Sequence, residues 1–338
     1  MTIQHSTPAQ LKKRLHEEVS KLSGLSAVEA QVREKFSSAS KLLVQIPDYL
    51  FETGGKRMRP VLCLMISRLL GVNHPTSKII DIAAGIELIH MATLLHDDII
   101  DKSPIRRHRQ SAYLRFGIPA TLLSGDFLLV RAFSLCAHLD DHIIDLTEKA
   151  CIELTEGEMD ELFLFDESPT LSASLEVCRK KTAALFRLSA ETAAYLVQGD
   201  TQVTRELASF GENLGIAFQI LDDVLDITAD EKVLGKKPGQ DLREKKPSVL
   251  NLIWLESGSA LARRFFSLPA GENEGLVEAA IEEMRSSPAI TRTRHLAEDY
   301  VNKALASLEA AAALSKSIDS QALAALRSLA DYTLSRLE

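Results

Sequence analysis

The sequence has 338 residues, 46% of them hydrophobic and 25% charged, which is the composition of an ordinary globular protein with a sizeable core. Its formal net charge of −8 argues against a general nucleic-acid-binding protein, because such proteins are usually basic, although it allows a local basic pocket for an anionic substrate. The N-terminus has no apolar signal-peptide core and no uncharged apolar run of about 18 residues occurs, so we expect no signal peptide and no transmembrane segment.

The four cysteines, Cys63, Cys136, Cys151 and Cys178, indicate a reducing compartment. None of them forms a C-x-x-C pair or has histidine neighbours at the spacing of zinc ligands. Three lie in apolar stretches with helical periodicity, where buried free thiols are common. We therefore expect reduced cysteines and a cytoplasmic location.

Apolar residues recur every three or four positions along almost the whole chain, which predicts helices. We expect an N-terminal helical extension within residues 1–25. Further helices are predicted over 27–50, 60–70, 76–101, 119–139, 143–165, 172–197, 203–228, 248–265, 274–285, 289–315 and 319–337. No segment alternates apolar with polar residues as a half-buried strand would. The sequence therefore predicts one all-α domain over residues 1–338, in which residues 79–100, apolar on nearly every side, form a central buried helix.

Three aspartates, Asp97, Asp98 and Asp101, cluster at the end of that helix. Positions i, i+1 and i+4 lie on one side of a helix, so the three carboxylates are close together. They repel one another and oppose the helix dipole unless cations neutralise them. Hard oxygen ligands of this kind suit Mg²⁺, which is commonly held by carboxylates together with substrate phosphates. Considered alone, the cluster is equally compatible with a solvated acidic helix end.

A second cluster with the same spacing, formed by Asp222, Asp223 and Asp226, ends another apolar helix. Gln219 lies one turn earlier on the same side. Two matching clusters at the ends of two buried helices indicate a shared cavity, in which metal ions could bridge both clusters to one diphosphate group. The second cluster therefore favours a magnesium site over two unrelated acidic surfaces.

Basic residues recur beside the two acidic clusters. They are Lys56, Arg57 and Arg59 in the segment GGKRMRP, the pair Arg106 and Arg107, Lys181 followed by Thr182, and Lys236 and Lys246 around a glycine-containing loop. Each alone would be interpreted as a solvated surface charge, but their recurrence favours binding of anionic diphosphates. His90 lies two turns before Asp97 on the same face, so we interpret it as functional, whereas we assign His96 a structural role.

Taken in order, the motifs GGKRMRP, HDDIID followed by RR, SGDFLL, KTA, FQILDDVLD and GKKPGQDL resemble those of the trans-type polyprenyl diphosphate synthase family, in particular its long-chain, octaprenyl-like subgroup. The resemblance extends from about residue 40 to the C-terminus. It implies the isoprenoid synthase fold, with central helices around a deep active-site cavity, and a homodimer. It also implies a prenyltransferase that condenses isopentenyl diphosphate with an allylic prenyl diphosphate, with several Mg²⁺ ions bridging the acidic motifs and the substrate diphosphate.

The resemblance implies roles for individual residues. The magnesium ions would be held by Asp97, Asp98, Asp101, Asp222, Asp223 and Asp226. The allylic diphosphate would be held by Arg106, Lys181 and Lys236, and isopentenyl diphosphate by Lys56, Arg59, His90 and Arg107. Lys181, Thr182 and Gln219 would line the reacting region as catalytic residues, and Lys246 would bind substrate from a closing loop. The double bond of isopentenyl diphosphate would attack the allylic cation, so no protein nucleophile is required, and the released diphosphate would accept the proton.

The sequence departs from the family pattern at three positions. His108 and Gln110 stand where glycine and proline are common after the paired arginines, and Glu161, in GEMDE, stands where glutamine is common. These departures leave the predicted metal and diphosphate ligands intact. They bear on local loop geometry and on substrate preference.

Small side chains before the first acidic motif predict a long product. Ala92 and Thr93 stand five and four residues before the first aspartate, where short-chain synthases commonly carry a bulky aromatic residue, and Ala84 and Gly85 lie two turns further back. A helical turn rises about 5.4 Å, on the order of one extended isoprene unit. Several open turns therefore imply a product in the hexaprenyl to decaprenyl range.

Several alternatives stay open. If the small residues instead pack against a neighbouring helix, Phe127 or Phe133 could close the tunnel early, and the enzyme would be a short-chain farnesyl or geranylgeranyl diphosphate synthase. A class I terpene cyclase would need no isopentenyl diphosphate and would carry a different second metal motif. A non-catalytic subunit of a heteromeric synthase usually lacks an acidic motif or the basic segment, and both are present here. An apolar product could also draw the protein to a membrane surface for product release.

Overall fold

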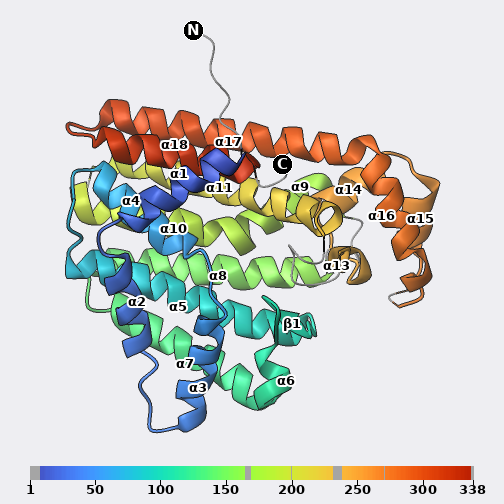
Figure 1. Ribbon diagram of the computed structural model, residues 1–338, viewed down its shortest axis with the longest axis horizontal. Helices are drawn as coiled ribbons and strands as arrows, with labels where there is room; N and C mark the ends of the chain where they lie inside the picture. The colour runs from blue at the N-terminus through green and yellow to red at the C-terminus, as the bar shows by residue number, and fades with distance from the viewer. Residues whose placement is uncertain (1–7, 164–168, 199, 231–237, 270, 336–338) are drawn as a thin grey trace.

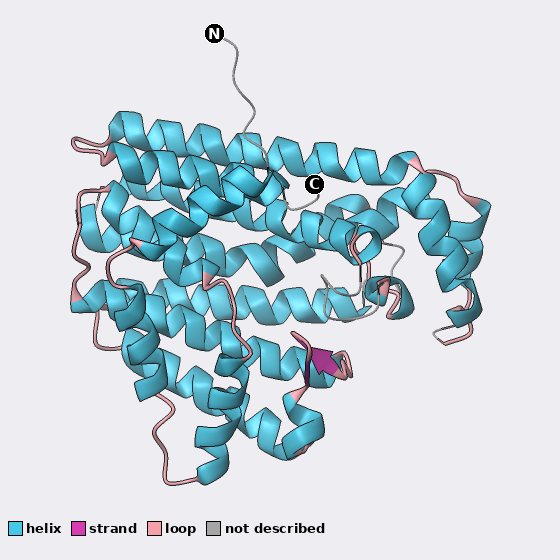
Figure 2. Ribbon diagram, viewed as in Figure 1, coloured by secondary structure: helices cyan, strands magenta, loops and turns pink. Residues whose placement is uncertain are grey.

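The structure, a computed structural model, describes residues 8–163, 169–198, 200–230, 238–269 and 271–335 (Figures 1 and 2). Helices make up nearly all of this part of the chain, as predicted. They are α1 (Pro8–Ser20), α2 (Leu25–Glu34), α3 (Lys41–Glu52), α4 (Met58–Leu69), α5 (Ser77–Ile100), α6 (Ala112–Phe116), α7 (Ile118–Cys136), α8 (Asp141–Phe163), α9 (Leu171–Val177), a π-helical segment (Cys178–Ala183), α10 (Ala184–Gln198), α11 (Thr201–Thr228), α13 (Gln240–Arg243), α14 (Val249–Glu256), α15 (Ala260–Ser267), a 3₁₀ turn (Glu274–Leu276), α16 (Val277–Ser286), α17 (Pro288–Leu314) and α18 (Ser320–Ser335).

A short hairpin follows α5. Its strands, β1 (Ile105–Arg106) and β2 (Arg109–Gln110), pair antiparallel over two residues each. Arg107 and His108 form the turn with φ of 48° and 64°, as in a type I′ hairpin. The sequence did not predict these strands, because two residues are too few to show alternation.

Two of the predicted helices are each divided. The predicted helix over 27–50 is interrupted between α2 and α3, where serine side chains compete for the backbone: the N–H of Ser40 donates to Oγ of Ser38 at 3.2 Å. The predicted helix over 248–265 is interrupted between α14 and α15 at Gly258, whose φ of 81° favours glycine.

Helices α5 and α11 carry the two acidic motifs. The N-terminus of α5 is capped by Thr76, whose side chain accepts a hydrogen bond from the N–H of Ile79, and most side chains of α5 are buried. Helix α10 packs against both α5 and α11 and lies between them in Figure 1. The C-terminal ends of α5 and α11 lie toward the right-hand end of that view, so the fold brings both motifs to one end of the molecule.

Two helices, α5 and α7, are long and apolar enough to cross a membrane, judged by length and composition alone. An apolar 18-residue stretch of each helix is 67% buried inside the protein in α5 and 33% buried in α7. Buried core helices pass the same test, so two such helices are weak grounds for assigning a membrane span.

Two hydrophobic clusters fill the core. The larger extends over α1 to α8, α10 and α11, and over α17 and α18, and the smaller is centred on α14 to α16, with Trp254 and Phe265 fully buried. Leu242 and Val249 belong to the smaller cluster. Because these two residues lie on either side of Lys246, the smaller cluster anchors the segment that carries this lysine.

Candidate active site

The two acidic motifs meet at a cavity of about 520 Å³. Asp97 lines it from α5 and Asp222 lines it from α11. The side chains predicted to hold isopentenyl diphosphate all line the same cavity: Lys56, Arg59, His90 and Arg107. The fold therefore brings together acidic and basic groups from segments that are far apart in the chain.

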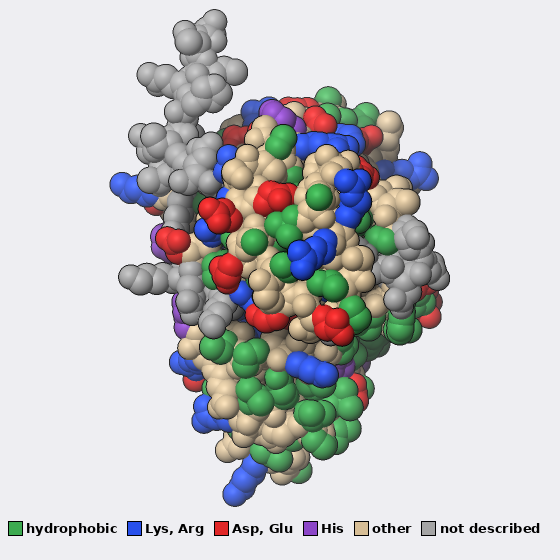
Figure 3. Space-filling model, turned by 90° about the vertical axis from the view of Figure 1, so that its right-hand side faces the viewer, with side chains coloured by type: hydrophobic (Ala, Val, Ile, Leu, Met, Phe, Trp, Pro, Cys, Tyr) green, Lys and Arg blue, Asp and Glu red, His purple; other side chains and the backbone are tan. Residues whose placement is uncertain are grey.

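A second cavity, of about 170 Å³, adjoins the first. Its lining includes the predicted residues Arg106, Lys246, Asp101 and Asp223. The two cavities share Asp97, Lys181, Thr182 and Gln219. The residues predicted to line the reacting region thus lie where the cavities join. Figure 3, which faces this end of the molecule, shows acidic and basic side chains interspersed in its upper half.

The turn before α4 is shaped by two glycines. Gly54 and Gly55 have φ of 80° and 147°, a region that favours glycine. A Cβ on Gly55 would lie 2.7 Å from Nη1 of Arg107, and this arginine donates a hydrogen bond to the carbonyl of Gly54. Lys56 follows the turn, and its Nζ donates to the hydroxyl of Tyr332 at 3.2 Å. The glycine pair therefore lets Arg107 and Lys56 share one wall of the large cavity.

Two neighbouring arginines have different tasks. Nη1 of Arg57 lies 3.0 Å from Oε1 of Glu87, and its guanidinium carbon lies 3.9 Å from the ring centroid of Phe51, so Arg57 supports the fold. Nε of Arg59 has no hydrogen-bond partner among the described residues. Burial lowers the pKa of Arg59 to about 10, which leaves it charged at neutral pH and available to an anion.

The two histidines of α5 also differ. Burial and the positive charges of Arg59 and Arg107 lower the pKa of His90 well below its ordinary value, so this residue is neutral near pH 7. A neutral imidazole can still donate one hydrogen bond to a phosphate oxygen. Nε2 of His96 lies 3.1 Å from the carbonyl oxygen of Leu122, which agrees with the structural role assigned to it.

Asp223 and Asp226 fasten α11 to the segment that follows it. Nε2 of Gln219 donates to Oδ1 of Asp223 at 3.0 Å, and the N–H of Val249 donates to Oδ2 at 2.9 Å. The N–H of Asp241 donates to Oδ2 of Asp226 at 3.0 Å. These bonds give both aspartates an anchoring role, and their role as metal ligands stays a prediction.

Lys181 and Thr182 lie in the π-helical segment between α9 and α10. Such turns inside α-helices are frequent at functional sites. Oγ1 of Thr182 donates to Oε1 of Gln219 at 2.7 Å, which joins the segment to α11. The periodicity of the predicted helix over 172–197 did not indicate the wider turn.

Two glycines hold neighbouring helices against this π-helical segment. A Cβ on Gly157 of α8 would lie 2.8 Å from both Cβ of Lys180 and the backbone nitrogen of Lys181. A Cβ on Gly215 of α11 would lie 2.6 Å from Cα of Ala183. Real Cβ atoms essentially never approach so closely, so only glycine allows these contacts. The segment that presents Lys181 is therefore clamped between α8 and α11.

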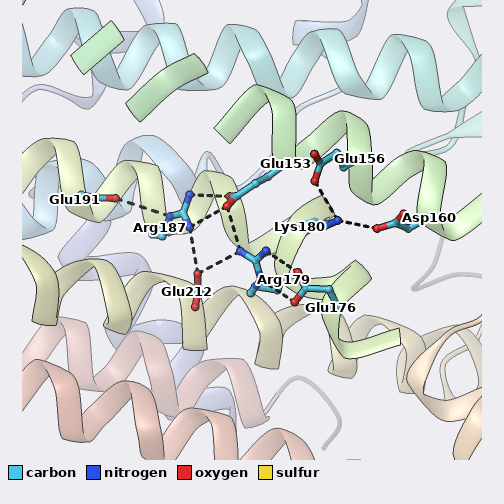
Figure 4. Close-up of polar contacts among 9 residues, drawn as sticks. All are labelled: Glu153, Glu156, Asp160, Glu176, Arg179, Lys180, Arg187, Glu191 and Glu212. Carbon is cyan, nitrogen blue, oxygen red and sulfur yellow. Dashed lines mark hydrogen bonds and ion pairs between the residues drawn. The ribbon is translucent and has the colours of Figure 1, made fainter. Parts of the chain in front are cut away.

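Ion pairs also tie the π-helical segment to α8 (Figure 4). Nη1 of Arg179 lies 3.3 Å from Oε1 of Glu153, which also binds Nη2 of Arg187 at 2.7 Å through its other oxygen. Nζ of Lys180 lies 2.9 Å from Oδ2 of Asp160. Glu153 and Asp160 belong to α8, so the network ties the π-helical segment and α10 to that helix and leaves Lys181 turned toward the cavities.

The departures from the family pattern lie at two places. His108 and Gln110 belong to the hairpin, and the carbonyl of Gln110 accepts a hydrogen bond from the hydroxyl of Tyr49 at 2.6 Å. Oε2 of Glu161 lies 2.5 Å from Nζ of Lys181 and 3.8 Å from Nζ of Lys246. Glu161 therefore stands between two lysines predicted to bind diphosphate.

Sequence reasoning missed several residues at the site. They are Phe186, Phe218, Glu158, Asp241 and Tyr332. Tyr332 lies 276 residues after its partner Lys56, so no local pattern could have found it. Two of them carried a sequence signal: Glu158 stands one helical turn before Glu161, and Asp241 is the aspartate of the motif GKKPGQDL. Lys236 lies outside the described residues, so its role stays a prediction.

A third cavity, of about 230 Å³, begins at Asp97 of the first acidic motif and lies between α5, α7 and α8. It shares Thr93, Asp97 and Lys181 with the large cavity, and its further walls are mostly apolar: Ile89, Ile100, Leu129, Cys151 and Leu154. A Cβ on Gly85 would lie 3.3 Å from Sγ of Cys136. Gly85 therefore serves close packing against α7, and the space beside the motif runs outward between α7 and α8.

The carboxylates fit a divalent cation shared with a substrate. The described residues contain no group of three or more His, Cys, Asp and Glu side chains that could hold a metal ion by themselves. Mg²⁺ does not need such a cage, because it is usually bound by one or two carboxylates with waters and substrate phosphates. Oδ2 of Asp98 is buried without a hydrogen-bond partner in the described structure, and burial raises the pKa of Asp97 to about 7. Both observations indicate a site that favours a bound cation.

The fold and the site define an all-α enzyme with two adjoining cavities, which are lined by basic side chains and by carboxylates of the two acidic motifs. The chain belongs to the polyprenyl synthetase family, whose model matches residues 40–284. The predicted family and all-α fold are thereby confirmed.

Named relatives support the same assignment. Octaprenyl diphosphate synthase of Escherichia coli (strain K12) is 34% identical over 289 residues, which cover 84% of this chain and 89% of the relative. Geranylgeranyl diphosphate synthase of Methanosarcina mazei is 32% identical over 298 residues, 85% of this chain and 88% of the relative. The crystal structure of a polyprenyl synthase from Caulobacter crescentus CB15, complexed with calcium and isoprenyl diphosphate, aligns with a TM-score of 0.88 at 31% identity and covers 96% of this chain and 98% of that chain.

Proposed function

We propose that this protein is a trans-prenyltransferase that condenses isopentenyl diphosphate with an allylic prenyl diphosphate and forms a long-chain all-trans polyprenyl diphosphate. The observation that carries the proposal is the junction of two charged cavities at Asp97, Lys181, Thr182 and Gln219. Two anionic substrates held on either side of this junction would have their reacting carbon atoms adjacent.

The basic residues divide between the two cavities in the way that two substrates require. Lys56, Arg59, His90 and Arg107 would hold isopentenyl diphosphate in the large cavity. Arg106, Lys181 and Lys246 would hold the allylic diphosphate in the small one, where negative charge builds as the carbon–oxygen bond breaks. Magnesium bound by the acidic motifs, with Asp97 and Asp222 as first candidates, would supply further neutralisation of that charge.

The reaction needs no protein nucleophile. The allylic carbon–oxygen bond breaks and its electron pair leaves with the diphosphate. The double bond of isopentenyl diphosphate then supplies the electron pair for the new carbon–carbon bond, and the released diphosphate takes the proton that is lost. Thr182 and Gln219, hydrogen bonded to each other at the junction, place oxygen atoms where they would stabilise the transient cation.

The third cavity supports a long product. Its apolar walls begin at Asp97 and Lys181, so a growing chain could leave the reacting region through it. Thr93 is small and lines the entrance. A product that ran along α5 instead would meet the close packing of Gly85 against α7, and this route would favour the short-chain alternative.

The test is to incubate the purified protein with farnesyl diphosphate, excess isopentenyl diphosphate and Mg²⁺, and to size the products by chromatography and mass spectrometry. We expect products in the hexaprenyl to decaprenyl range. Products that stop at geranylgeranyl diphosphate would refute the long-chain assignment, and absence of any condensation would refute the proposed function.

We propose in addition that the protein is a homodimer. Large hydrophobic side chains are exposed along α6, α7 and α8, among them Leu114, Leu123, Val130, Ile152 and Met159, each 47–67% exposed. Figure 3 shows hydrophobic side chains gathered in its lower half, where α6 and the start of α7 lie. Light scattering on the purified protein should give twice the mass of one chain, and a monomer would contradict the proposal.

The cytoplasm is the proposed location. All four cysteines are free thiols, and three of them are buried, which suits a reducing compartment. The exposed apolar side chains beside the third cavity also suit transient contact with a membrane surface during product release. Flotation with phospholipid vesicles, with and without bound product, would measure that contact.

A further inference from the structure

We propose that Glu161 makes binding of the allylic diphosphate depend on divalent cations, by neutralising the two lysines that would otherwise hold that diphosphate directly. The inference rests on the proposed function, because it concerns the cavity assigned to the allylic substrate. Among the ion pairs of the described residues, Glu161 is the one carboxylate that pairs with both Lys181 and Lys246.

The lysines are already surrounded by carboxylates. Nζ of Lys181 lies 2.5 Å from Oε2 of Glu161 and 2.6 Å from Oε2 of Glu158. Nζ of Lys246 lies 3.0 Å from Oδ2 of Asp101, 3.2 Å from Oε2 of Glu244 and 3.8 Å from Oε2 of Glu161. Each positive charge is therefore balanced within the protein before a phosphate competes for it.

The small cavity as a whole is poor in positive charge. Its described lining residues include five carboxylates, Asp97, Asp101, Glu161, Asp223 and Asp241, against three basic side chains, Arg106, Lys181 and Lys246. A diphosphate brings further negative charge into this cavity. It can be accommodated when cations enter with it, or when a lysine leaves its carboxylate partner.

Glu161 differs from the other carboxylates in its place and partners. It stands on α8, outside both acidic motifs, and its two ion pairs are to lysines. Its charge therefore weakens the attraction of Lys181 and Lys246 for a diphosphate. Glutamine has the same shape without the charge, so Glu161→Gln removes this competition and leaves the acidic motifs unchanged.

The test is calorimetric titration of wild type and Glu161→Gln with inorganic diphosphate, once in EDTA and once in saturating Mg²⁺. In EDTA we expect the variant to bind diphosphate on the order of tenfold more tightly, since one of the carboxylates that compete with the diphosphate for each lysine has lost its charge. In Mg²⁺ the two proteins should agree within about twofold, because the ions supply the missing positive charge.

A matched control is Glu156→Gln. Glu156 lies on the same helix, and its Oε2 lies 3.0 Å from Nζ of Lys180. This lysine belongs to the ion pairs that tie the π-helical segment to α8 (Figure 4). This variant loses the same charge without touching Lys181 or Lys246, so its affinity in EDTA should equal that of wild type. Glu161→Asp keeps the charge, so its binding of diphosphate should depend on Mg²⁺ as that of wild type does. Thermal unfolding of each variant verifies that it is folded.

The outcomes separate the inference from the proposed function. Equal or weaker binding of diphosphate by Glu161→Gln in EDTA would show that Glu161 merely orients the lysines and would overturn the inference. An equal gain in Glu156→Gln would assign the effect to net charge and overturn it as well. A wild-type protein that fails to bind farnesyl thiodiphosphate even with Mg²⁺ would refute the proposed function itself.

Discussion

Replacing Gly157 with alanine tests whether the clamp on the π-helical segment positions Lys181 for catalysis. The added Cβ would lie 2.8 Å from Cβ of Lys180 and from the backbone nitrogen of Lys181. Ordinary van der Waals contact requires 3.4–4 Å, so α8 or the segment must move by about 0.6–1.2 Å. One partner in this contact is the backbone nitrogen of Lys181, so a change of side-chain rotamer cannot relieve the overlap.

The size of the effect follows from that displacement. Overpacking of this kind costs about 1–3 kcal/mol of unfolding free energy. A misplacement of about 1 Å in a reacting group can cost about 100-fold in rate. We therefore expect Gly157→Ala to lower kcat about 100-fold. The KM for isopentenyl diphosphate should stay within about twofold, because Lys56 and Arg59 line the large cavity from a different segment of the chain.

The assay combines single-turnover kinetics with thermal unfolding, and Gly275→Ala is the matched control. A Cβ on Gly275 would meet no atom within 4 Å, so this variant should behave as wild type in both measurements. If Gly157→Ala unfolds at a lower temperature but keeps kcat within about twofold, the clamp only stabilises the fold. That result would refute the positioning role.

Other expectations follow from the same site. Asp97→Ala, or addition of a chelator, should lower turnover by orders of magnitude, and normal turnover with chelator would contradict the magnesium requirement. Because burial raises the pKa of Asp97 to about 7, its carboxyl gains a proton below that pH, so Mg²⁺ affinity measured by calorimetry should fall between about pH 8 and 6; a constant affinity would count against Asp97 as a ligand. Lys56→Ala should mainly raise the KM for isopentenyl diphosphate and Lys246→Ala that for the allylic substrate, whereas identical profiles would refute the division into two cavities. Thr93→Phe should shorten the product while the first condensation persists, and an unchanged product would exclude the route through the third cavity.

The acidic motifs and the central helices could be predicted from the sequence, because the patterns that define them are local. Asp97 and Asp101 stand one helical turn apart at the end of an apolar helix, and the same holds for Asp222 and Asp226. Helical periodicity and i, i+4 spacing need no knowledge of the rest of the chain. The breaks between α2 and α3 and between α14 and α15 were missed because turn chemistry there overrides the apolar pattern.

Only the tertiary structure decided how these pieces act together. The left-handed turn at Arg107 and His108 sends Arg106 to one cavity and Arg107 to the other, although the two arginines are adjacent in sequence. The π-helical segment depends on glycines of α8 and α11, and the partners of Lys56 and Lys181 come from distant helices. The hairpin turn is too short to show a periodic pattern, and the other features depend on contacts between different helices, which local periodicity and spacing do not encode.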